Sequence, residues 1–520
     1  MMKLKKIFNI YMPVFIIGLL MMTVFGCTEK LNAPFEDEAF TSDVDYSKGE
    51  NMILPLLGAY YRFYDQTWDG AITYSIRGDD VYVAGDQAPM WEQDAFSYQA
   101  SHWNINGFWQ HQYDAIVNVF SEMDEINKYR PAANNDALAD QYIAECRVIR
   151  AWEYLTLAKT FGGCIVIDQL DNIQSTPVSN KGEVMQYIVD EMDEVIPNLP
   201  AVRPNERADV KGGITQFTAY AIQAMAYQEM ENYQGVVDAT SAIISPNKFQ
   251  LSSDFYHLFK TAGKLNDENI LEFQFSDFGQ GQGDQFNHLF APYGIAWNPV
   301  RTGAGGGWGF YEPTEKYIKF MLDRSEKERL ETTVVWTPAG MTKMTNDWGP
   351  LPSWINNFNR EGDEFIDNPR KFWGAGKFIQ PSTELIEERT APGSNKNLIV
   401  IRYSEMLLMY AEALTRGATS SIGMTADEAV NLVRARAGLG NLSGVTTKQV
   451  LDEKFAELGT EWGIRFFDMV RTKNTEALSF SNYSKSEGKE IDRTFTMDKA
   501  YLPYPAAQVA TLPQLAEGNQ

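Results

Sequence analysis

The chain has 520 residues, of which 22% are charged, and its formal net charge at pH 7 is −24. This excess of negative charge argues against nucleic acid or an anionic lipid surface as a partner, because both are themselves negatively charged. The length is sufficient for one large core or for several subdomains.

The first 26 residues are typical of a lipoprotein signal peptide. Three lysines precede an apolar run that ends at Phe25, and Cys27 follows Gly26 directly. A basic segment, an apolar segment and a small residue before the cleavage point indicate secretion, and a Cys at that point indicates lipidation. The alternative is a membrane anchor, since the run approaches the ~20 residues that span a bilayer, but a proline interrupts it. We expect cleavage after residue 26, lipid on Cys27 and a polar tether over residues 27–44.

Residues 45–248 are predicted to be mostly helical. Apolar residues recur every three or four positions over residues 109–123 and again over residues 136–160. Residues 216–230 and 233–244 form two further predicted helices, which are joined by a very short turn. Helix pairs of this kind are typical of tetratricopeptide-like arrays, although the chain has no strict repeat of about 34 residues.

Two stretches depart from the helical pattern. Residues 68–107 are irregular and rich in aromatic side chains, and residues 249–397 combine short apolar runs, glycine-rich segments and frequent proline. Such compositions are typical of loops and short strands. We interpret residues 249–397 as a loop-rich subdomain that is inserted into the helical scaffold.

Residues 398–520 return to a helical pattern. Tyr403, Leu407, Tyr410 and Leu414 recur at steps of 4, 3 and 4, which places them on one face of a helix. Two more helices are predicted after it. The predicted fold is therefore mainly α, a tetratricopeptide-like helix-pair scaffold with an inserted loop-rich subdomain that contains short strands.

The same segment carries an ordered series of short motifs. They are Ile401-Arg402-x-x-Glu405, Tyr410-Ala411-Glu412-Ala413, Val433-Arg434-x-Arg436-Ala437-Gly438-Leu439 and Glu461-Trp462-Gly463-x-Arg465-Phe466-Phe467-Asp468-x-x-Arg471. In this order they resemble the SusD/RagB family, although the last motif departs from the family's common basic–Glu–Gly form at its start. Members of that family are surface lipoproteins of Gram-negative bacteria that capture nutrients, usually glycans, for a SusC-type TonB-dependent transporter.

The resemblance implies a function and a place in the cell. It implies a protein that is lipid-anchored to the outer membrane, faces the exterior, binds an oligosaccharide or polysaccharide, and delivers it to a SusC-like transporter. It also implies that the helix pairs on either side of the insertion stack into one scaffold. Peptide uptake, as in RagB-like members, is the alternative, and a scaffolding role without a ligand stays open.

The residues themselves give no support for catalysis. The four histidines form no zinc-binding spacing, and no G-x-S-x-G motif occurs. Glu405 and Glu412 share a helix face but lie about 10.5 Å apart along the axis, whereas paired glycosidase carboxylates lie about 5–9.5 Å apart. We interpret them, together with Asp468, as structural partners of arginines, with Glu405 paired to Arg402. We expect no enzyme activity, no cofactor and no metal site; a lipid-anchored glycoside hydrolase is the remaining alternative.

Most of the tryptophans lie outside the predicted helices. A flat indole can stack on the apolar face of a sugar while polar neighbours bind its hydroxyl groups. Any one of these rings could instead fill a small core, but we expect at least two of the set to face a ligand. Nine tryptophans lie outside the predicted helices: Trp68, Trp91, Trp103, Trp297, Trp308, Trp336, Trp348, Trp354 and Trp373. The other three, Trp109, Trp152 and Trp462, fall on core-facing helix positions.

Two clusters of aromatic and polar residues form the predicted ligand site. The ligand face of SusD-like proteins is built from loops in comparable places, so the resemblance supports this location. The first cluster holds Arg77, Asp80, Tyr82, Trp103 and Asn106, and the second holds Tyr293, Trp297, Arg301 and Trp308.

Two cysteines remain besides Cys27. Cys146 falls on the apolar face of a predicted helix, and Cys164 follows two glycines at a turn. We expect two buried thiols, although a disulfide is possible outside the inner membrane.

Overall fold

The computed structural model describes residues 44–64, 68–83, 87–170, 173–276, 309–367, 370–384, 395–485 and 487–517. The predicted signal peptide, Cys27 and all but the last residue of the tether lie outside these ranges, as do Tyr293, Trp297, Arg301 and Trp308. Helices dominate the described part of the chain and the strands form two-stranded sheets, so the prediction of a mainly α fold is confirmed.

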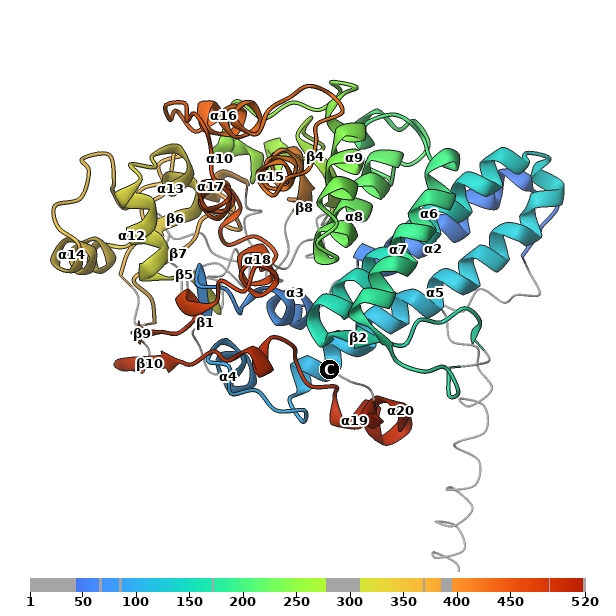
Figure 1. Cartoon of the computed structure of the whole chain (residues 1–520), viewed down its shortest axis with the longest axis horizontal. Coiled ribbons are helices and arrows are strands. Elements are labelled where there is room, and N and C mark those ends of the chain that lie inside the picture. Colours follow the sequence, from blue (N-terminus) through green and yellow to red (C-terminus); the bar gives the residue numbers. More distant parts are fainter. Residues whose placement is uncertain are drawn as a thin grey trace, which may run out of the picture.

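The first half of the chain folds into a row of antiparallel helices (Figure 1). The long helices α5 and α6 pack against each other, and each later helix packs on the one before it up to α9. The ends of α6 follow the local sequence: Asn135 caps its first turn through a bond from Leu138 N, and Gly162 ends it with a φ of 78°. The helices of this row are α2 (Ile53–Tyr64), α5 (Trp103–Ala133), α6 (Asp136–Phe161), α7 (Lys181–Val195), α8 (Gln216–Glu229) and α9 (Tyr233–Ile244).

The C-terminal helices continue the same scaffold. Helix α15 packs on α9 as well as on its own neighbours α16 and α17, so helices from both sides of the insertion form one core. Strand β4 (Asn269–Phe273) pairs antiparallel with β8 (Leu398–Arg402), which brings both ends of the insertion together. The helices are α15 (Tyr403–Thr415), α16 (Ala426–Arg436), α17 (Thr447–Leu458) and α18 (Ile464–Arg471).

The inserted subdomain has a small core of its own, and its helices α12, α13 and α14 are drawn in yellow in Figure 1. Tyr317, Trp336 and Trp373 are buried in it, and Phe455 of α17 joins the subdomain to the scaffold. Its elements are α10 (Phe255–Leu258), α12 (Glu315–Asp323), α13 (Glu328–Thr333), α14 (Pro338–Asp347), β6 (Val334–Trp336) and β7 (Trp373–Ala375).

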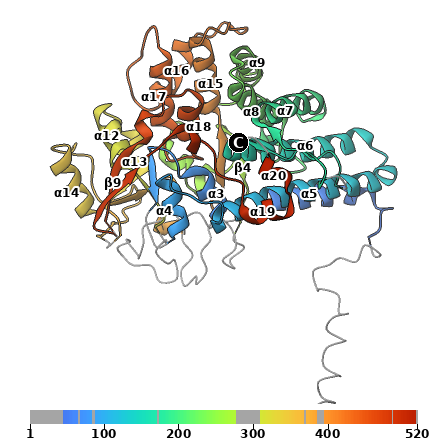
Figure 2. The same cartoon turned by 60° about the horizontal axis from the view of Figure 1, so that its bottom comes forward.

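The remaining elements are short and join distant parts of the chain. Strand β1 pairs with β5, and β9 pairs with β10 in a hairpin. Figure 2 shows α19 beside the start of α5, with which it is in contact. These short elements are α3 (Trp68–Ser75), β1 (Val81–Val83), α4 (Ala88–Asp94), β2 (Gly163–Cys164), β3 (Ser179–Asn180), β5 (Tyr311–Pro313), β9 (Phe480–Ser484), β10 (Lys489–Arg493), α19 (Ala506–Thr511) and α20 (Gln514–Glu517).

A buried charge network joins α17 to the insertion. Arg402 binds three carboxylates, with distances of 2.6 Å to Glu268, 2.7 Å to Glu457 and 2.9 Å to Glu461. The predicted pairing of Arg402 with Glu405 is therefore wrong, because residues far apart in sequence supply its partners. The network comprises Arg329, Lys377, Arg402 and Arg436 with Glu268, Glu326, Glu453, Glu457 and Glu461.

Two other predictions about buried groups are confirmed. Glu412 is buried and binds the guanidinium of Arg471 through both carboxylate oxygens, each at 2.9 Å. Cys146 and Cys164 are free, buried thiols. Among the described residues, no helix combines the length and the apolar character that a membrane crossing requires.

Candidate functional site

Two residues of the first predicted cluster lie in the interior. The guanidinium of Arg77 stacks on Phe466, 4.3 Å from the ring centroid, and donates to the carbonyl of Ala500. Asp80 accepts a bond of 2.7 Å from the backbone N–H of Thr460, and burial raises its pKa to about 6. Both side chains are at most 1% exposed. They hold the 77–83 segment against the C-terminal part of the chain and have no surface to offer a ligand, which corrects the prediction for these two residues.

Trp103 and Asn106 lie at the surface, at the first turn of α5. Trp103 is 39% exposed, and Asn106 is half-buried between Gln110 and Gln508, to which its amide is bonded. His102 pairs with Glu92 of α4 at 2.9 Å. The pair joins α4 to α5 and brings the backbone at Trp91 and Trp103 to the same part of the surface.

Trp91 was among the nine tryptophans but not in either predicted cluster. It is 38% exposed and lies at the rim of an open hollow of about 580 Å³ between α4 and the β9–β10 hairpin, which we call the hairpin hollow. Figures 1 and 2 both place α4 beside that hairpin. Tyr82 also lines the hollow, although its side chain is almost fully buried.

Polar side chains complete the hairpin hollow. Arg493 donates to the carbonyls of Arg77, Gly78 and Val81 and pairs with Asp94 at 3.2 Å, so its charge is held in place. The other lining residues are Val83, Asn482, Ser484, Glu487, Lys489 and Ile491. An exposed indole beside amide, hydroxyl and charged groups can stack on an apolar ring face while binding hydroxyl groups around it.

Sequence reasoning had no signal for the hairpin side of this hollow. Residues 480–493 are mostly polar and contain no tryptophan, the residue on which the prediction of the clusters depended. Only the folding of this hairpin onto α4, more than 380 positions away in sequence, makes it part of a site.

Comparison with known proteins finds similarity to one family. The model of the SusD family matches residues 267–520. A SusD-like protein of Bacteroides ovatus is 23% identical over 72% of this chain and 67% of its own length. SusD-like protein P2 of Formosa agariphila is 23% identical over 96% of this chain and 97% of its own length.

The chain is therefore similar to SusD-like proteins, and its C-terminal half matches the family model. Solved structures share its fold. Surface glycan-binding protein A from Bacteroides thetaiotaomicron, in complex with laminarihexaose, has a TM-score of 0.71 at 21% identity, covering 90% of this chain and 98% of that one. A laminarin-binding SusD-like protein has the same TM-score at 20% identity, covering 89% and 97% of the two chains.

The other tryptophans of this chain divide between core and surface. Trp336 and Trp373 are each 3% exposed and belong to the core of the insertion. Trp348 is 36% exposed, and its Nε1 donates to Asp323 at 2.9 Å. Trp354 is half-buried. The side chain of Trp68 lies outside the described part of the structure.

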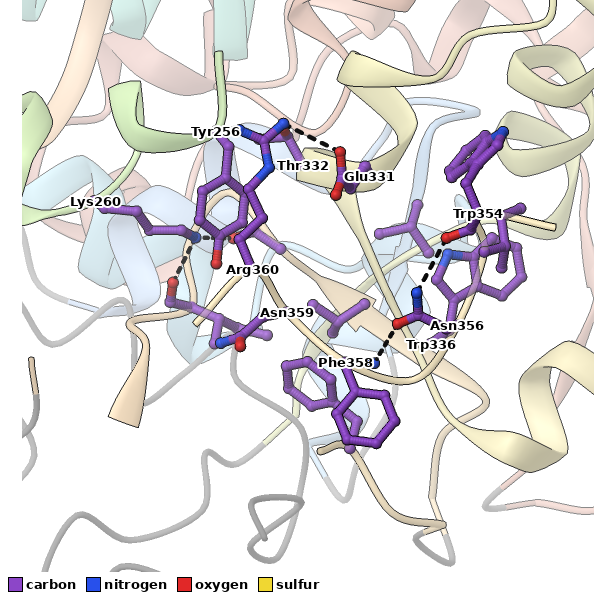
Figure 3. Close-up of a pocket in the computed structure, with 16 residues that line it drawn as sticks. Tyr256, Lys260, Glu331, Thr332, Trp336, Trp354, Asn356, Phe358, Asn359 and Arg360 are labelled. Atoms are coloured by element: carbon purple, nitrogen blue, oxygen red, sulfur yellow. Dashed lines mark hydrogen bonds and ion pairs between the residues drawn. The ribbon is translucent and has the colours of Figure 1, made fainter. Parts of the chain in front are cut away.

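A second hollow opens in the inserted subdomain (Figure 3). We call it the Trp336 hollow because the buried indole of Trp336 forms part of its wall. Trp354, Phe358 and Tyr256 add aromatic surface, and Phe358 is 51% exposed. None of the predicted site residues that the structure describes lines this hollow.

The site residues give no sign of metal chemistry. Within the described ranges, no group of three or more His, Cys, Asp or Glu side chains is arranged to hold a metal ion.

Proposed function

We propose that this SusD-like protein binds an oligosaccharide or polysaccharide at the bacterial surface and delivers it to a SusC-like TonB-dependent transporter. The observation that carries the proposal is the exposure of Trp91 at the polar hairpin hollow, with the exposed Trp103 on the neighbouring helix that the His102–Glu92 pair joins to α4. Neighbouring exposed aromatic rings with polar groups around them often mark a surface that contacts a partner. Relatives whose names state a glycan or laminarin ligand support the same chemistry.

The predicted lipoprotein signal peptide supports a location at the outer membrane. Lipid on Cys27 would hold the protein at the outer membrane, where a receptor can meet both its ligand and the transporter. Replacing Cys27 with Ser should release the protein from the membrane fraction and abolish labelling by a radioactive fatty acid. Labelling that persists in the variant would contradict this part of the proposal.

Ligand binding can be measured by isothermal titration with laminarihexaose, a wider glycan panel and a peptide panel. Trp91→Ala and Trp103→Ala should each weaken glycan binding about tenfold, equal to ~1.4 kcal/mol, with little change in melting temperature because both rings are exposed. Trp348→Ala is the matched control, since its indole is equally exposed but projects from the end of α14.

Each result of the titration decides between functions. Binding of peptides and not of glycans would replace the proposal with the RagB-like alternative. Equal binding by all three tryptophan variants would show that Trp91 and Trp103 are not part of the glycan site. Turnover of a glycan, lost on removal of one carboxylate, would indicate a hydrolase instead. Co-purification of the lipidated chain with a SusC-like barrel tests the delivery step.

A further inference from the structure

An open groove lies between the inserted subdomain and the β9–β10 hairpin. Helices α12 and α14 form one side of it and the hairpin forms the other, and Figures 1 and 2 both place these elements next to one another. We call it the α14 groove. Among the residues that line it are Phe320 of α12, Lys343, Asn346 and Asp347 of α14, and Tyr483 and Glu490 of the hairpin.

The α14 groove and the hairpin hollow lie on opposite faces of the hairpin, because successive side chains of a strand point to opposite sides. Ser484 and its cross-strand partner Lys489 line the hollow, whereas Tyr483 and its partner Glu490 line the groove. Asn482 borders both. The thickness of the hairpin therefore separates the two, and a polymer that leaves one of them can reach the other.

Aromatic side chains lie on both sides of the groove. Phe320 and Tyr483 line it from opposite sides, and both are half-buried, so each presents part of its surface there. The ring of Tyr483 is held in place by Phe372, with ring centroids 6.1 Å apart, and by Lys343, whose Nζ lies 5.8 Å from its centroid. Partly exposed rings in fixed positions are suited to stacking on a flat apolar face of a ligand.

Polar groups that a ligand can reach stand beside these rings. Glu490 and Asn346 are exposed and have no hydrogen bond or ion pair with another described residue. Asp347 is also exposed, and it pairs with Lys343 at 2.5 Å through Oδ2 alone, which leaves Oδ1 available. The groove therefore offers carboxylate and amide oxygens that can accept hydrogen bonds from hydroxyl groups.

The lysines of the groove do not favour an anion. Lys319 pairs with Glu315 at 2.5 Å, and Lys343 pairs with the other oxygen of Glu315 at 2.7 Å. Lys316 pairs with Asp79 at 3.1 Å. Since each lysine already has a carboxylate, a negatively charged ligand would lose hydration without gaining a free cation. A neutral ligand with many hydroxyl groups fits this balance of charge.

We propose that the α14 groove is a second glycan-binding site, which holds further sugars of a neutral polysaccharide that is also bound at the hairpin hollow. The rings of Phe320 and Tyr483 stack on sugar rings. The oxygens of Asn346, Asp347 and Glu490 accept hydrogen bonds from sugar hydroxyl groups. The inference rests on the proposed glycan-binding function and extends that site across the hairpin. Two linked sites raise the affinity for a polymer above that for a fragment that occupies only one of them.

The test compares a short and a long form of the same neutral glycan by isothermal titration. The trisaccharide and the polymer of laminarin are the first pair, and the other neutral glycans of the panel are used in the same two lengths. Tyr483→Ala should lower the affinity for the polymer about tenfold and leave the affinity for the trisaccharide unchanged. A polymer also offers more overlapping binding positions than a trisaccharide, but this statistical gain is the same for wild type and variant.

Tyr61→Ala is the matched control, because it truncates the same type of side chain at an exposed position on α2 and should change neither affinity. Glu490→Ala covers the case in which Tyr483→Ala does not fold. Glu490 is exposed and has no partner among the described residues, so its removal leaves the fold intact and should weaken binding of the polymer several-fold.

Three results would overturn the inference. Equal affinity of wild type, Tyr483→Ala and Glu490→Ala for the polymer would remove the groove from the site, while trisaccharide binding that Trp91→Ala abolishes would still support the proposed function. Loss of trisaccharide binding in Tyr483→Ala would place Tyr483 in the first site. A polymer of uronic acids that loses affinity in Tyr483→Ala would contradict a neutral ligand. If no glycan of either length binds, the proposed function fails together with the inference.

Discussion

Glu412→Ala should destabilise the fold more than any surface substitution. Glu412 is 0% exposed and accepts bonds from Arg471 at 2.9 and 2.9 Å, from Arg416 at 2.8 Å and from Gln228 at 3.1 Å. Removing one partner of a buried ion pair costs about 3–5 kcal/mol, because the other charge is left without compensation. Arg471 keeps Asp468 at 2.8 Å, and the partly exposed Arg416 can turn to water, so we expect the lower end, about 3 kcal/mol.

The free energy of unfolding can be measured in urea by circular dichroism. Glu194→Ala is the matched control, since Glu194 also pairs with an arginine, Arg147 at 2.6 Å, but its side chain is 68% exposed; exposed pairs contribute about 0–1 kcal/mol. A second variant, Glu412→Leu with Arg471→Met, removes both charges and should recover part of the loss. A loss in Glu412→Ala that is no larger than in Glu194→Ala would refute the structural role of this carboxylate.

Two further predictions concern titration and reactivity. Burial raises the pKa of Glu405 to about 7 and that of Asp80 to about 6, above their ordinary values near 4. The folded state therefore binds protons that the unfolded state releases, and the melting temperature should rise from pH 7 to about pH 5. Although burial opposes it, arginines hold the pKa of Glu457 well below its ordinary range, so stability should fall below about pH 4. A melting temperature that falls between pH 7 and pH 5 would contradict the raised pKa values of Glu405 and Asp80. Burial also raises the thiol pKa of Cys146 and Cys164, so a thiol reagent should modify them only after unfolding, and rapid modification of the native protein would disprove their burial.

The candidate site was only partly predictable. The aromatic stretch of residues 68–107 does contain the exposed Trp91 and Trp103, but the prediction that it is irregular is wrong at these positions, because Trp91 lies in α4 and Trp103 begins α5. The same stretch contains Arg77, which looked equally polar and loop-like in sequence. Whether such a side chain is exposed depends on what covers it, and Phe466 and Ala500, which cover Arg77, come from the other end of the chain.

Local patterns in the sequence were enough to predict most of the long helices and many of the residues on their buried faces. Trp109 and Trp152 are buried as the apolar periodicity predicts, because that periodicity is a property of each helix and needs no distant partner. The burial of Trp336 and the binding of Arg402 to Glu268 and Glu461, in place of its near neighbour Glu405, depend on contacts between distant parts of the chain. The position of a buried charge or a loop aromatic depends on the side chains that surround it. Those side chains come from segments that are distant in sequence, so the residues next to it in the chain do not predict them.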